Sequence, residues 1–238
     1  MATKIIRNKN SFVLLNEDLS NISDGIFTYF ENNQEITSTR KKAGRGTVTF
    51  FRNDQSNLVH KAYRRGGLIR KLISNFYLWT GLTRTRAYIE FVGLKTMLEL
   101  GLSVPKPVAA RIVRQGIFYK AELVTQEIED ATTFGKNLAE NNLSTELLEG
   151  LGRTIKSFHH KGFMHPDLNI ENILIDSSKQ IFFLDFDQAR PLKPKKIQDS
   201  SDMKRFKRSI KKFCLKSGRD FPKVEWETIL KSYDNKAH

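Results

Sequence analysis

A group of polar side chains around one short hairpin constrains this chain more than any other feature. Residues 165–172 read His-Pro-Asp-Leu-Asn-Ile-Glu-Asn, and Asp185 opens an Asp-Phe-Asp triplet eighteen positions after Asp167. Between them, the apolar runs 173–175 and 181–184 are bridged by a polar turn, a pattern that predicts a β-hairpin. The hairpin therefore holds the polar groups on loops at its two ends.

The side chains in this group have the chemistry of a metal and phosphate site. Mg²⁺ prefers oxygen ligands, and one amide (Asn172) with one carboxylate (Asp185) leaves coordination positions for phosphate oxygens. A second carboxylate, Asp167, is able to accept a hydroxyl proton. The pattern H-x-D-x-x-x-x-N followed by D-F-x carries phosphoryl transfer to an alcohol in kinases. For His165, a buried role that holds the loop by hydrogen bonds is an alternative to a reactive one.

Upstream residues complete the same chemistry. Kinases bind ATP phosphates with a lysine on a strand after a glycine-containing turn, and a glutamate on the next helix orients it. Lys61 follows Gly44 and Gly46 in this order, and Glu90 lies in the first turns of a helix predicted over residues 87–100. Each residue alone is also compatible with an ordinary solvated surface, so the prediction depends on their order in the chain.

The coarse pattern predicts an α+β protein with strands first and helices later. Strands are predicted at 47–51, 57–63, 108–113 and 117–126, and helices at 87–100, at 144–162 and in the basic tail 193–238. An acidic turn at 127–130 marks the boundary. We therefore expect a β-rich N-terminal lobe over residues 1–128 and a C-terminal lobe over 129–238.

Composition narrows the partners and the compartment. Lys and Arg total 40 against 26 acidic residues, a net charge of +14, which attracts nucleic acid, anionic lipid or phosphorylated small molecules. Cys214 is the one cysteine, so no internal disulfide forms, and a reducing cytoplasm is expected. The longest uncharged run, 72–83, is shorter than the roughly 20 residues of a membrane span. No transmembrane segment or signal peptide is expected.

Several stretches together resemble one family. They are residues 44–47, 63–68, 90–91, 101–111, 165–176, 185–187 and 205–209. The chain is similar to the 3-deoxy-D-manno-octulosonic acid (Kdo) kinases of Gram-negative bacteria, lipopolysaccharide core kinases that are distant relatives of protein kinases. The resemblance implies a two-lobed protein-kinase-like fold. It also implies an enzyme dependent on ATP and Mg²⁺ that phosphorylates the 4-hydroxyl of the Kdo sugar of Kdo-lipid A, peripherally on the cytoplasmic face of the inner membrane.

The resemblance implies a role for each matching residue. Lys61 is expected to bind the α- and β-phosphates of ATP, with Glu90 holding it. Asp167 is expected to orient and deprotonate the sugar hydroxyl, while Asn172 and Asp185 hold Mg²⁺.

The remaining matched positions concern nucleotide binding and the catalytic loop. Glu127 and Ile128 are the expected hinge whose backbone meets adenine, Gly44 and Gly46 belong to the phosphate-covering turn, and His165 belongs to the catalytic loop.

Two departures from the protein-kinase pattern disfavour a protein substrate. Asp187 replaces the glycine of D-F-G, and no A-P-E segment follows it. The chain that remains after Asp187 is too short for the usual peptide-docking lower lobe and activation segment.

The acceptor is expected near a basic and aromatic segment. Arg64 and Arg65 precede the uncharged run 72–83, which contains Phe76 and Trp79. An apolar segment bracketed by cations is typical of an interfacial anchor on an anionic leaflet. The alternative is that Phe76 and Trp79 pack in the core while the arginines are solvated.

Other functions remain open at this stage. Within the enzyme class, the acceptor could instead be a core heptose or a soluble small molecule such as an aminoglycoside. A sequence pI near 9.8 also fits a non-catalytic nucleic-acid-binding protein. No zinc finger or RNP-like strand supports that reading, so we expect no nucleic-acid partner. A catalytically dead kinase fold is disfavoured because the catalytic positions hold their expected residues.

Overall fold

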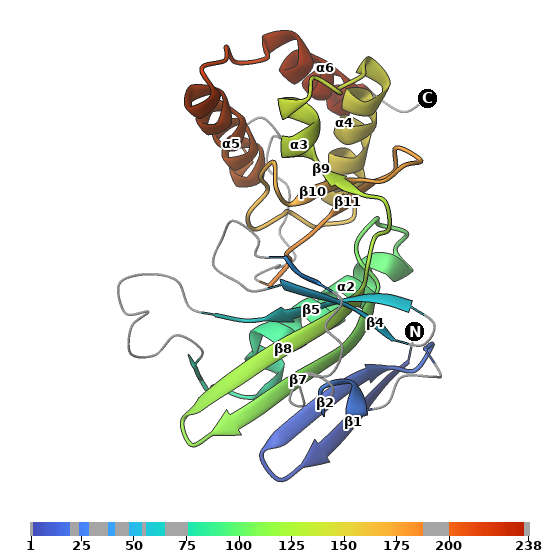
Figure 1. The fold of residues 1–238 in the computed structure, drawn as a ribbon, viewed down its shortest axis with the longest axis vertical. Coiled ribbons are helices and arrows are strands. Elements are labelled where there is room, and N and C mark those ends of the chain that lie inside the picture. The colour runs from blue at the N-terminus through green and yellow to red at the C-terminus, as the bar shows by residue number, and fades with distance from the viewer. Residues whose placement is uncertain are drawn as a thin grey trace. The chain divides into compact units, whose positions relative to one another are not determined.

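The computed structural model describes residues 2–19, 24–28, 38–40, 48–53, 56–64, 76–187 and 200–235. Contacts divide the chain into two compact units (Figure 1). The first contains Met1–Glu99 and Pro105–Glu127, and the second contains Leu100–Val104 and Ile128–His238. The short segment Leu100–Val104 belongs to the second unit, where the Ser103 carbonyl accepts a hydrogen bond from the Phe183 amide (3.1 Å).

The first unit is built on one antiparallel sheet. Its elements are β1 (Thr3–Asn8), β2 (Ser11–Asn16), η1 (Asp24–Ile26), β3 (Ser38–Arg40), β4 (Val48–Asn53), β5 (Ser56–Ala62), β6 (Tyr77–Leu78), η3 (Leu82–Arg84), α2 (Arg86–Glu99), β7 (Pro107–Gln115) and β8 (Phe118–Gln126). Seven strands follow the order β1-β2-β7-β8-β5-β4-β3 in the described chain, and β6 pairs with β8. The predicted strands at 47–51, 57–63, 108–113 and 117–126 are confirmed as β4, β5, β7 and β8.

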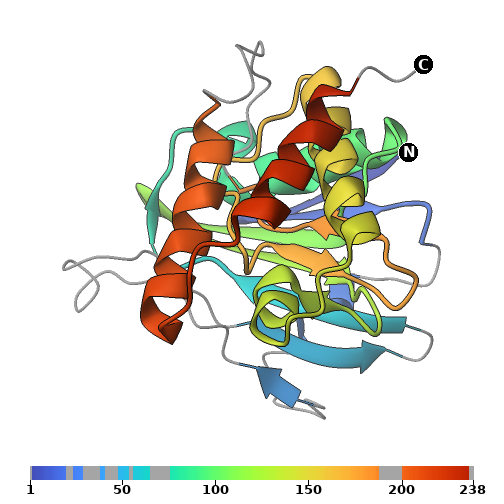
Figure 2. The same cartoon turned by 90° about the horizontal axis from the view of Figure 1, so that it is seen from above.

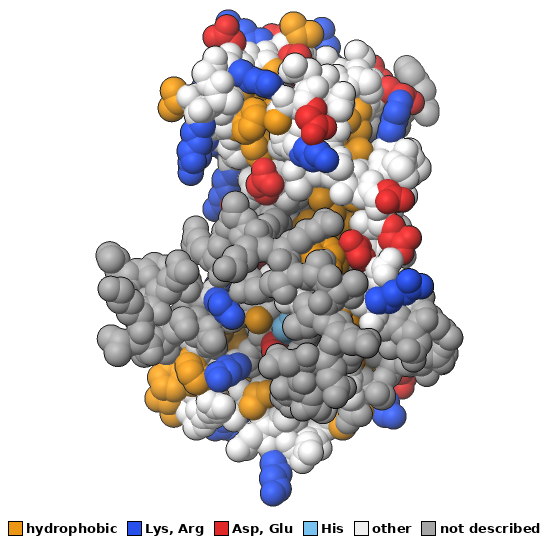
Figure 3. Space-filling model, viewed as in Figure 1, with side chains coloured by type: hydrophobic (Ala, Val, Ile, Leu, Met, Phe, Trp, Pro, Cys, Tyr) orange, Lys and Arg blue, Asp and Glu red, His pale blue; other side chains and the backbone are white. Residues whose placement is uncertain are grey.

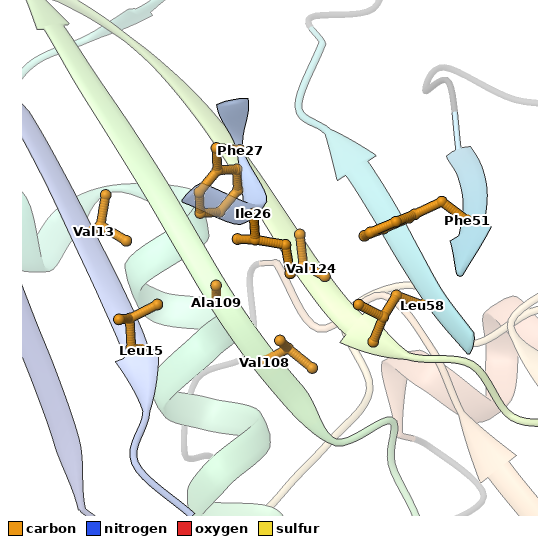
Figure 4. Close-up of a cluster of buried hydrophobic side chains, with 9 residues drawn as sticks. All are labelled: Val13, Leu15, Ile26, Phe27, Phe51, Leu58, Val108, Ala109 and Val124. Carbon is orange, nitrogen blue, oxygen red and sulfur yellow. The ribbon is translucent and has the colours of Figure 1, made fainter. Parts of the chain in front are cut away.

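The two faces of this sheet have different partners. Successive side chains of a strand point to opposite faces. Lys61 of β5 contacts Glu90 of α2, so Leu58, three positions earlier, lies on the other face. That face carries a buried cluster, which Figure 4 shows: Val13, Leu15, Ile26, Phe27, Phe51, Leu58, Val108, Ala109 and Val124. Burying side chains of this size stabilises the fold by about 1.5–3 kcal/mol each. The cluster therefore fixes the strand that presents Lys61 toward α2.

The second unit is mostly helical around a small sheet. Its elements are β9 (Thr132–Thr133), α3 (Phe134–Ala139), α4 (Thr145–His160), β10 (Ile173–Ile175), β11 (Ile181–Phe183), α5 (Ser201–Ser217) and α6 (Lys223–Asp234). The predicted hairpin is confirmed, since β10 and β11 pair antiparallel with Ile173 opposite Phe183. Helices α4 and α6 run side by side in both ribbon views (Figure 1 and Figure 2).

Helix α4 follows its sequence pattern closely. Ser144 caps it by accepting a hydrogen bond from the Leu147 amide (3.3 Å), and the expected stripe of Leu147, Leu151 and Phe158 is buried. Within the predicted helical tail 193–238, the described residues form the two helices α5 and α6, and Gly218, with a left-handed backbone (φ 64°), ends α5.

A buried polar group ties α4, α5 and α6 together. His159 Nε2 lies 2.7 Å from an Asp202 carboxylate oxygen, and His159 Nδ1 lies 3.2 Å from the Tyr233 hydroxyl. Burial disfavours the Asp202 carboxylate and is the largest single influence on it, but the hydrogen bonds and charge interactions of this carboxylate, those with His159 foremost, together outweigh that cost and leave the pKa of Asp202 below its usual value. Among the described helices, none is both long and apolar enough to cross a membrane.

Candidate active site

Lys61 and Glu90 meet in the first unit. The Lys61 Nζ lies 2.7 Å and 3.1 Å from the two Glu90 carboxylate oxygens. Glu90 is only 3% exposed, so its charge depends on this partner, while Lys61 remains half-buried. The expected lysine–glutamate pair is therefore formed, with the ammonium group at the more open end.

Tyr63 is a member of this group that sequence reasoning missed. Its hydroxyl donates a hydrogen bond to a Glu90 carboxylate oxygen, and the Lys61 Nζ lies 4.8 Å from the centre of its ring. The signal was present in the spacing, because residues two apart on a strand share a face. A buried tyrosine also needs a hydrogen-bond partner. Glu90 is therefore held by both Lys61 and Tyr63.

His165 is bonded through both of its ring nitrogens. The Nε2–H donates to the Leu184 carbonyl (2.6 Å), and Nδ1 accepts from the Asp167 amide (3.0 Å). These roles assign the neutral ring with the proton on Nε2. Burial lowers the pKa of His165 to about 4, although the Leu184 bond and nearby carboxylates act in the opposite direction. His165 positions the loop, which is the alternative that the sequence left open.

Asp167 and Asn172 are joined within the loop. The Asn172 Nδ2 and the Asn169 Nδ2 both donate to the Asp167 backbone carbonyl, at 3.0 Å and 2.9 Å. Asn172 is 4% exposed, whereas the Asp167 side chain is exposed. The loop thus fixes the backbone of Asp167 and leaves its carboxylate accessible to a reactant.

Asp185 follows a residue that is held from two sides. The Leu184 amide donates to the Asn172 carbonyl (2.9 Å), and the Leu184 carbonyl accepts from His165. The next residue, Phe186, is fully buried and stacks on Phe158 with ring centres 5.8 Å apart. Asp185 itself has φ of 71°, a left-handed conformation that is uncommon outside glycine and is concentrated at functional sites.

Asn172 and Asp185 are the residues in this loop that could hold a divalent cation. Their amide and carboxylate oxygens are the donors that Mg²⁺ prefers, and a nucleotide site needs only one or two such ligands because phosphates and water supply the rest. Asn172 uses its nitrogen for the bond to Asp167, so its oxygen is the end able to ligate a cation. The described residues contain no group of three or more His, Cys, Asp or Glu arranged for a metal.

Helix α5 also holds the loop that contains Asp167 by hydrogen bonds. The Arg205 guanidinium donates to the Pro166 carbonyl, and the Ile170 amide donates to the Ser209 hydroxyl (3.2 Å). Sequence reasoning marked residues 205–209 only as a stretch of resemblance. The structure gives two of these residues a direct contact with the loop that contains Asp167.

The contacts described above, around Lys61 and Glu90 and around the loop of Asp167, do not include the remaining candidate residues. The Glu127 amide donates to the Asn57 carbonyl (2.9 Å) at the end of β8, and Ile128 is half-buried. Arg64 is exposed. Gly44, Gly46 and Arg65 lie outside the described residues.

Trp79 packs within the first unit. It stacks on Phe12 (ring centres 5.7 Å apart) and meets Tyr119 edge-on (6.2 Å), and the Arg114 guanidinium lies 5.2 Å from the centre of its ring. In the same segment, Leu78 is 55% exposed. The exposed apolar side chain next to Trp79 is therefore Leu78, while Trp79 is half-buried.

Comparison with known sequences gives several close relatives. The 3-deoxy-D-manno-octulosonic acid kinase of Vibrio cholerae serotype O1 is 36% identical over 223 residues, covering 92% of this chain and 91% of that protein. The protein of the same name from Photobacterium damsela subsp. piscicida is 32% identical over 232 residues, covering 96% and 95%.

Solved structures share the mixed α+β fold. The structure described as WaaP in complex with acyl carrier protein has a TM-score of 0.62 at 16% identity, over 94% of this chain and 89% of that one. WbdD with a kinase inhibitor has a TM-score of 0.51 at 13% identity, over 84% of this chain and 45% of that one. These identities show the fold alone. The model of the lipopolysaccharide kinase (Kdo/WaaP) family matches residues 31–233, and the chain belongs to this family.

Proposed function

We propose that this chain is a Kdo kinase, which transfers the γ-phosphoryl group of ATP to the 4-hydroxyl of the Kdo sugar of Kdo-lipid A. The family and the relatives named 3-deoxy-D-manno-octulosonic acid kinase support this acceptor. The observation that carries the proposal is the hydrogen-bonded loop of the second unit. It joins Asp167 and Asn172 to the residue before Asp185 through one set of bonds.

Lys61 binds the α- and β-phosphates of the nucleotide in this proposal. Its ammonium group is half-buried and already oriented by the Glu90 carboxylate, so binding ATP requires little ordering of the side chain. Glu90 and Tyr63 act as positioning residues, because they touch Lys61 or each other. The backbone at Glu127 and Ile128 meets adenine, and Gly44 and Gly46 belong to the turn that covers the phosphates.

Asp167 accepts the proton of the sugar hydroxyl as the oxygen attacks. A bond forms between that oxygen and the γ-phosphorus, the bond from phosphorus to the β-phosphate oxygen breaks, and ADP leaves. Mg²⁺, held by Asn172 and Asp185 when bound, would neutralise charge on the phosphate oxygens. The transition state is loose, so orientation and charge neutralisation supply most of the acceleration.

The acceptor is anchored in a membrane by its lipid part, so we propose that the enzyme acts peripherally at the cytoplasmic face of the inner membrane. Arg64 and Arg65 are the cations proposed to meet the anionic sugar and phosphates. In the aromatic segment, Leu78 supplies the exposed apolar contact, while Trp79 packs against Phe12 and Tyr119 within the first unit.

The test is phosphate transfer from labelled ATP, with Mg²⁺, to Kdo-lipid A, heptosylated core and an aminoglycoside in parallel. We expect labelled Kdo-lipid A, and mass spectrometry should find the phosphate on the Kdo 4-hydroxyl. Label in heptose alone or in the aminoglycoside alone would instead identify one of the rival acceptors within the kinase class. Duplex DNA is included as a fourth sample. If the protein binds the DNA but transfers phosphate to none of the acceptors, the result would favour a nucleic-acid-binding protein and contradict the proposal.

A further inference from the structure

Four cations form one row along α5. Lys204, Arg208, Lys212 and Lys216 recur at four-residue intervals, and all four side chains are exposed. Residues at this spacing are neighbours on a helix surface, and like charges there destabilise the helix. The row therefore lowers the stability of α5, so helix stability does not explain why these four cations are present.

An exposed leucine lies among these cations. Leu215 is 85% exposed and lies seven residues after Arg208 and four after Lys211, on the same face of the helix. The core side of α5 is the stripe of Phe206, Ile210 and Cys214. Leu215 lies away from that stripe, so it contributes little to the core.

Three of the four cations on this face have no ionic partner among the described residues. They are Arg208, Lys212 and Lys216. The single acidic residue of α5, Asp202, is 1% exposed and bonded to His159. In Figure 3, Lys and Arg side chains follow the left edge of the space-filling view at α5.

The same helix holds the loop that contains Asp167. Arg205 donates to the Pro166 carbonyl, and Ser209 accepts from the Ile170 amide. These two residues lie beside the row of cations around the helix, one position after Lys204 and Arg208 respectively. A surface that binds these cations would therefore bind α5, the same helix that positions the loop containing Asp167.

We propose that the outer face of α5, defined by Lys204, Arg208, Lys212, Leu215 and Lys216, docks on an anionic lipid bilayer. This inference rests on the proposed function, because a lipid-linked acceptor requires the loop to work at a bilayer surface. A basic helix face with an exposed apolar side chain is the composition that binds an anionic leaflet, through phosphate contacts and shallow insertion. Nucleic acid would use the cations but has no use for Leu215.

The test is co-sedimentation with vesicles, without nucleotide or acceptor. Full-length protein is mixed with vesicles of equimolar phosphatidylcholine and phosphatidylglycerol, or of phosphatidylcholine alone. The test variant carries Arg208→Gln, Lys212→Gln and Lys216→Gln, and a matched control carries Lys4→Gln, Lys9→Gln and Lys231→Gln, which are exposed cations elsewhere. We expect binding to the anionic vesicles to weaken on the order of 100-fold in the test variant and little in the control.

Two single variants separate docking from folding and from charge alone. Lys212→Glu creates opposite-charge pairs with Arg208 and Lys216, so it should raise the thermal stability while weakening vesicle binding. Leu215→Ser removes no charge and should weaken vesicle binding roughly tenfold without changing binding to duplex DNA. Equal vesicle binding by the test and control variants would overturn the proposal.

The two proposals fail separately. If vesicle binding depends on α5 but the wild type transfers no phosphate to Kdo-lipid A, the docking surface stands and the Kdo kinase function is wrong. If transfer occurs but the test variant binds vesicles as well as the control, only the docking surface is wrong. Loss of DNA binding in the test variant with unchanged vesicle binding would assign the face to nucleic acid.

Discussion

His165 lies at 3% exposure with both ring nitrogens bonded inside the second unit. Burial holds its pKa near 4, below the value of 6.5 for an unperturbed histidine. The unfolded chain therefore binds a proton at this residue at a higher pH than the folded chain does. Stability from the neutral ring is complete above pH 6.5 and is lost as the pH falls toward about 4.

This difference gives a measurable pH dependence. Between pH 7 and about pH 5, protonation of the unfolded-state imidazole should lower the free energy of unfolding by roughly 2 kcal/mol. A His165→Gln variant should be less stable at pH 7 but lack this part of the decline. Denaturant unfolding of both proteins at the two pH values measures it, and equal declines would contradict a buried neutral histidine.

Tyr63 provides a second prediction at the residue scale. Tyr63→Phe removes the hydroxyl donor to the buried Glu90 carboxylate while keeping the ring beside Lys61. Loss of a hydrogen bond to a charged group should cost about 1.5–3 kcal/mol of stability. A positioning role further predicts a several-fold higher KM for ATP with a smaller change in kcat.

The matched control for this experiment is Tyr88→Phe on α2. Its hydroxyl makes no hydrogen bond with the described residues, so both stability and KM should stay near wild type. An unchanged KM in Tyr63→Phe would restrict Tyr63 to a structural role.

Individual residues show how much of the candidate site could be predicted from the sequence. The loop pattern predicted Asp167, Asn172 and Asp185 as site residues, because their spacing is tied to one hairpin that forms locally. It could not reveal the left-handed backbone of Asp185, because aspartate adopts many conformations and tertiary packing selects among them. Tyr63 was missed for a related reason, since its partner comes from a helix far along the chain.

Packing between α4 and α6 gives a prediction at the scale of elements. At Gly152, an added Cβ would lie 2.9 Å from the Ser232 Cβ and 3.0 Å from the Tyr233 amide nitrogen, and would collide with the Ile229 carbonyl. Because two of these atoms are backbone, the helices must separate. Gly152→Ala should therefore lower the free energy of unfolding by about 1–3 kcal/mol or more.

Gly150 on the same helix is the matched control. Its added Cβ would meet only the Ile181 Cδ1, at an ordinary 3.6 Å. Gly150→Ala should stabilise α4 by up to about 1 kcal/mol, because alanine has the higher helix propensity. Chemical unfolding of the two variants should give opposite signs, and destabilisation of similar size in both would contradict close packing at Gly152.

Elements with a clear hydrophobic period were predictable. Helix α4 has a capped start and a regular buried stripe, and β10 with β11 has a polar turn. The hairpin of β1 and β2 was missed, because β1 is an exposed edge strand and β2 is a continuous buried run. Neither alternates in the way that marks a half-buried strand, so only pairing with β7 explains β2.

At the scale of the whole molecule, the positive charge predicted an anionic partner but not where it binds. The sequence predicted the acceptor near Arg64, Arg65 and the run 72–83, and within that run Trp79 packs on Phe12. The row on α5 was hidden in a tail read simply as basic and helical. The side of α5 that carries the row only became clear once the buried stripe of the helix was known, because the exposed face of a helix lies opposite its buried face.

The central claim is that Asp185 acts in phosphoryl transfer to Kdo-lipid A. The sharpest variant is Asp185→Asn, since asparagine tolerates the left-handed backbone that alanine would strain. Asp234→Asn changes an exposed carboxylate elsewhere and serves as the control. The measurement is the single-turnover rate of phosphate transfer from labelled ATP to Kdo-lipid A. We predict a loss of roughly a thousandfold or more in Asp185→Asn and a wild-type rate in Asp234→Asn; an Asp185→Asn protein that keeps most of the wild-type rate would contradict the account.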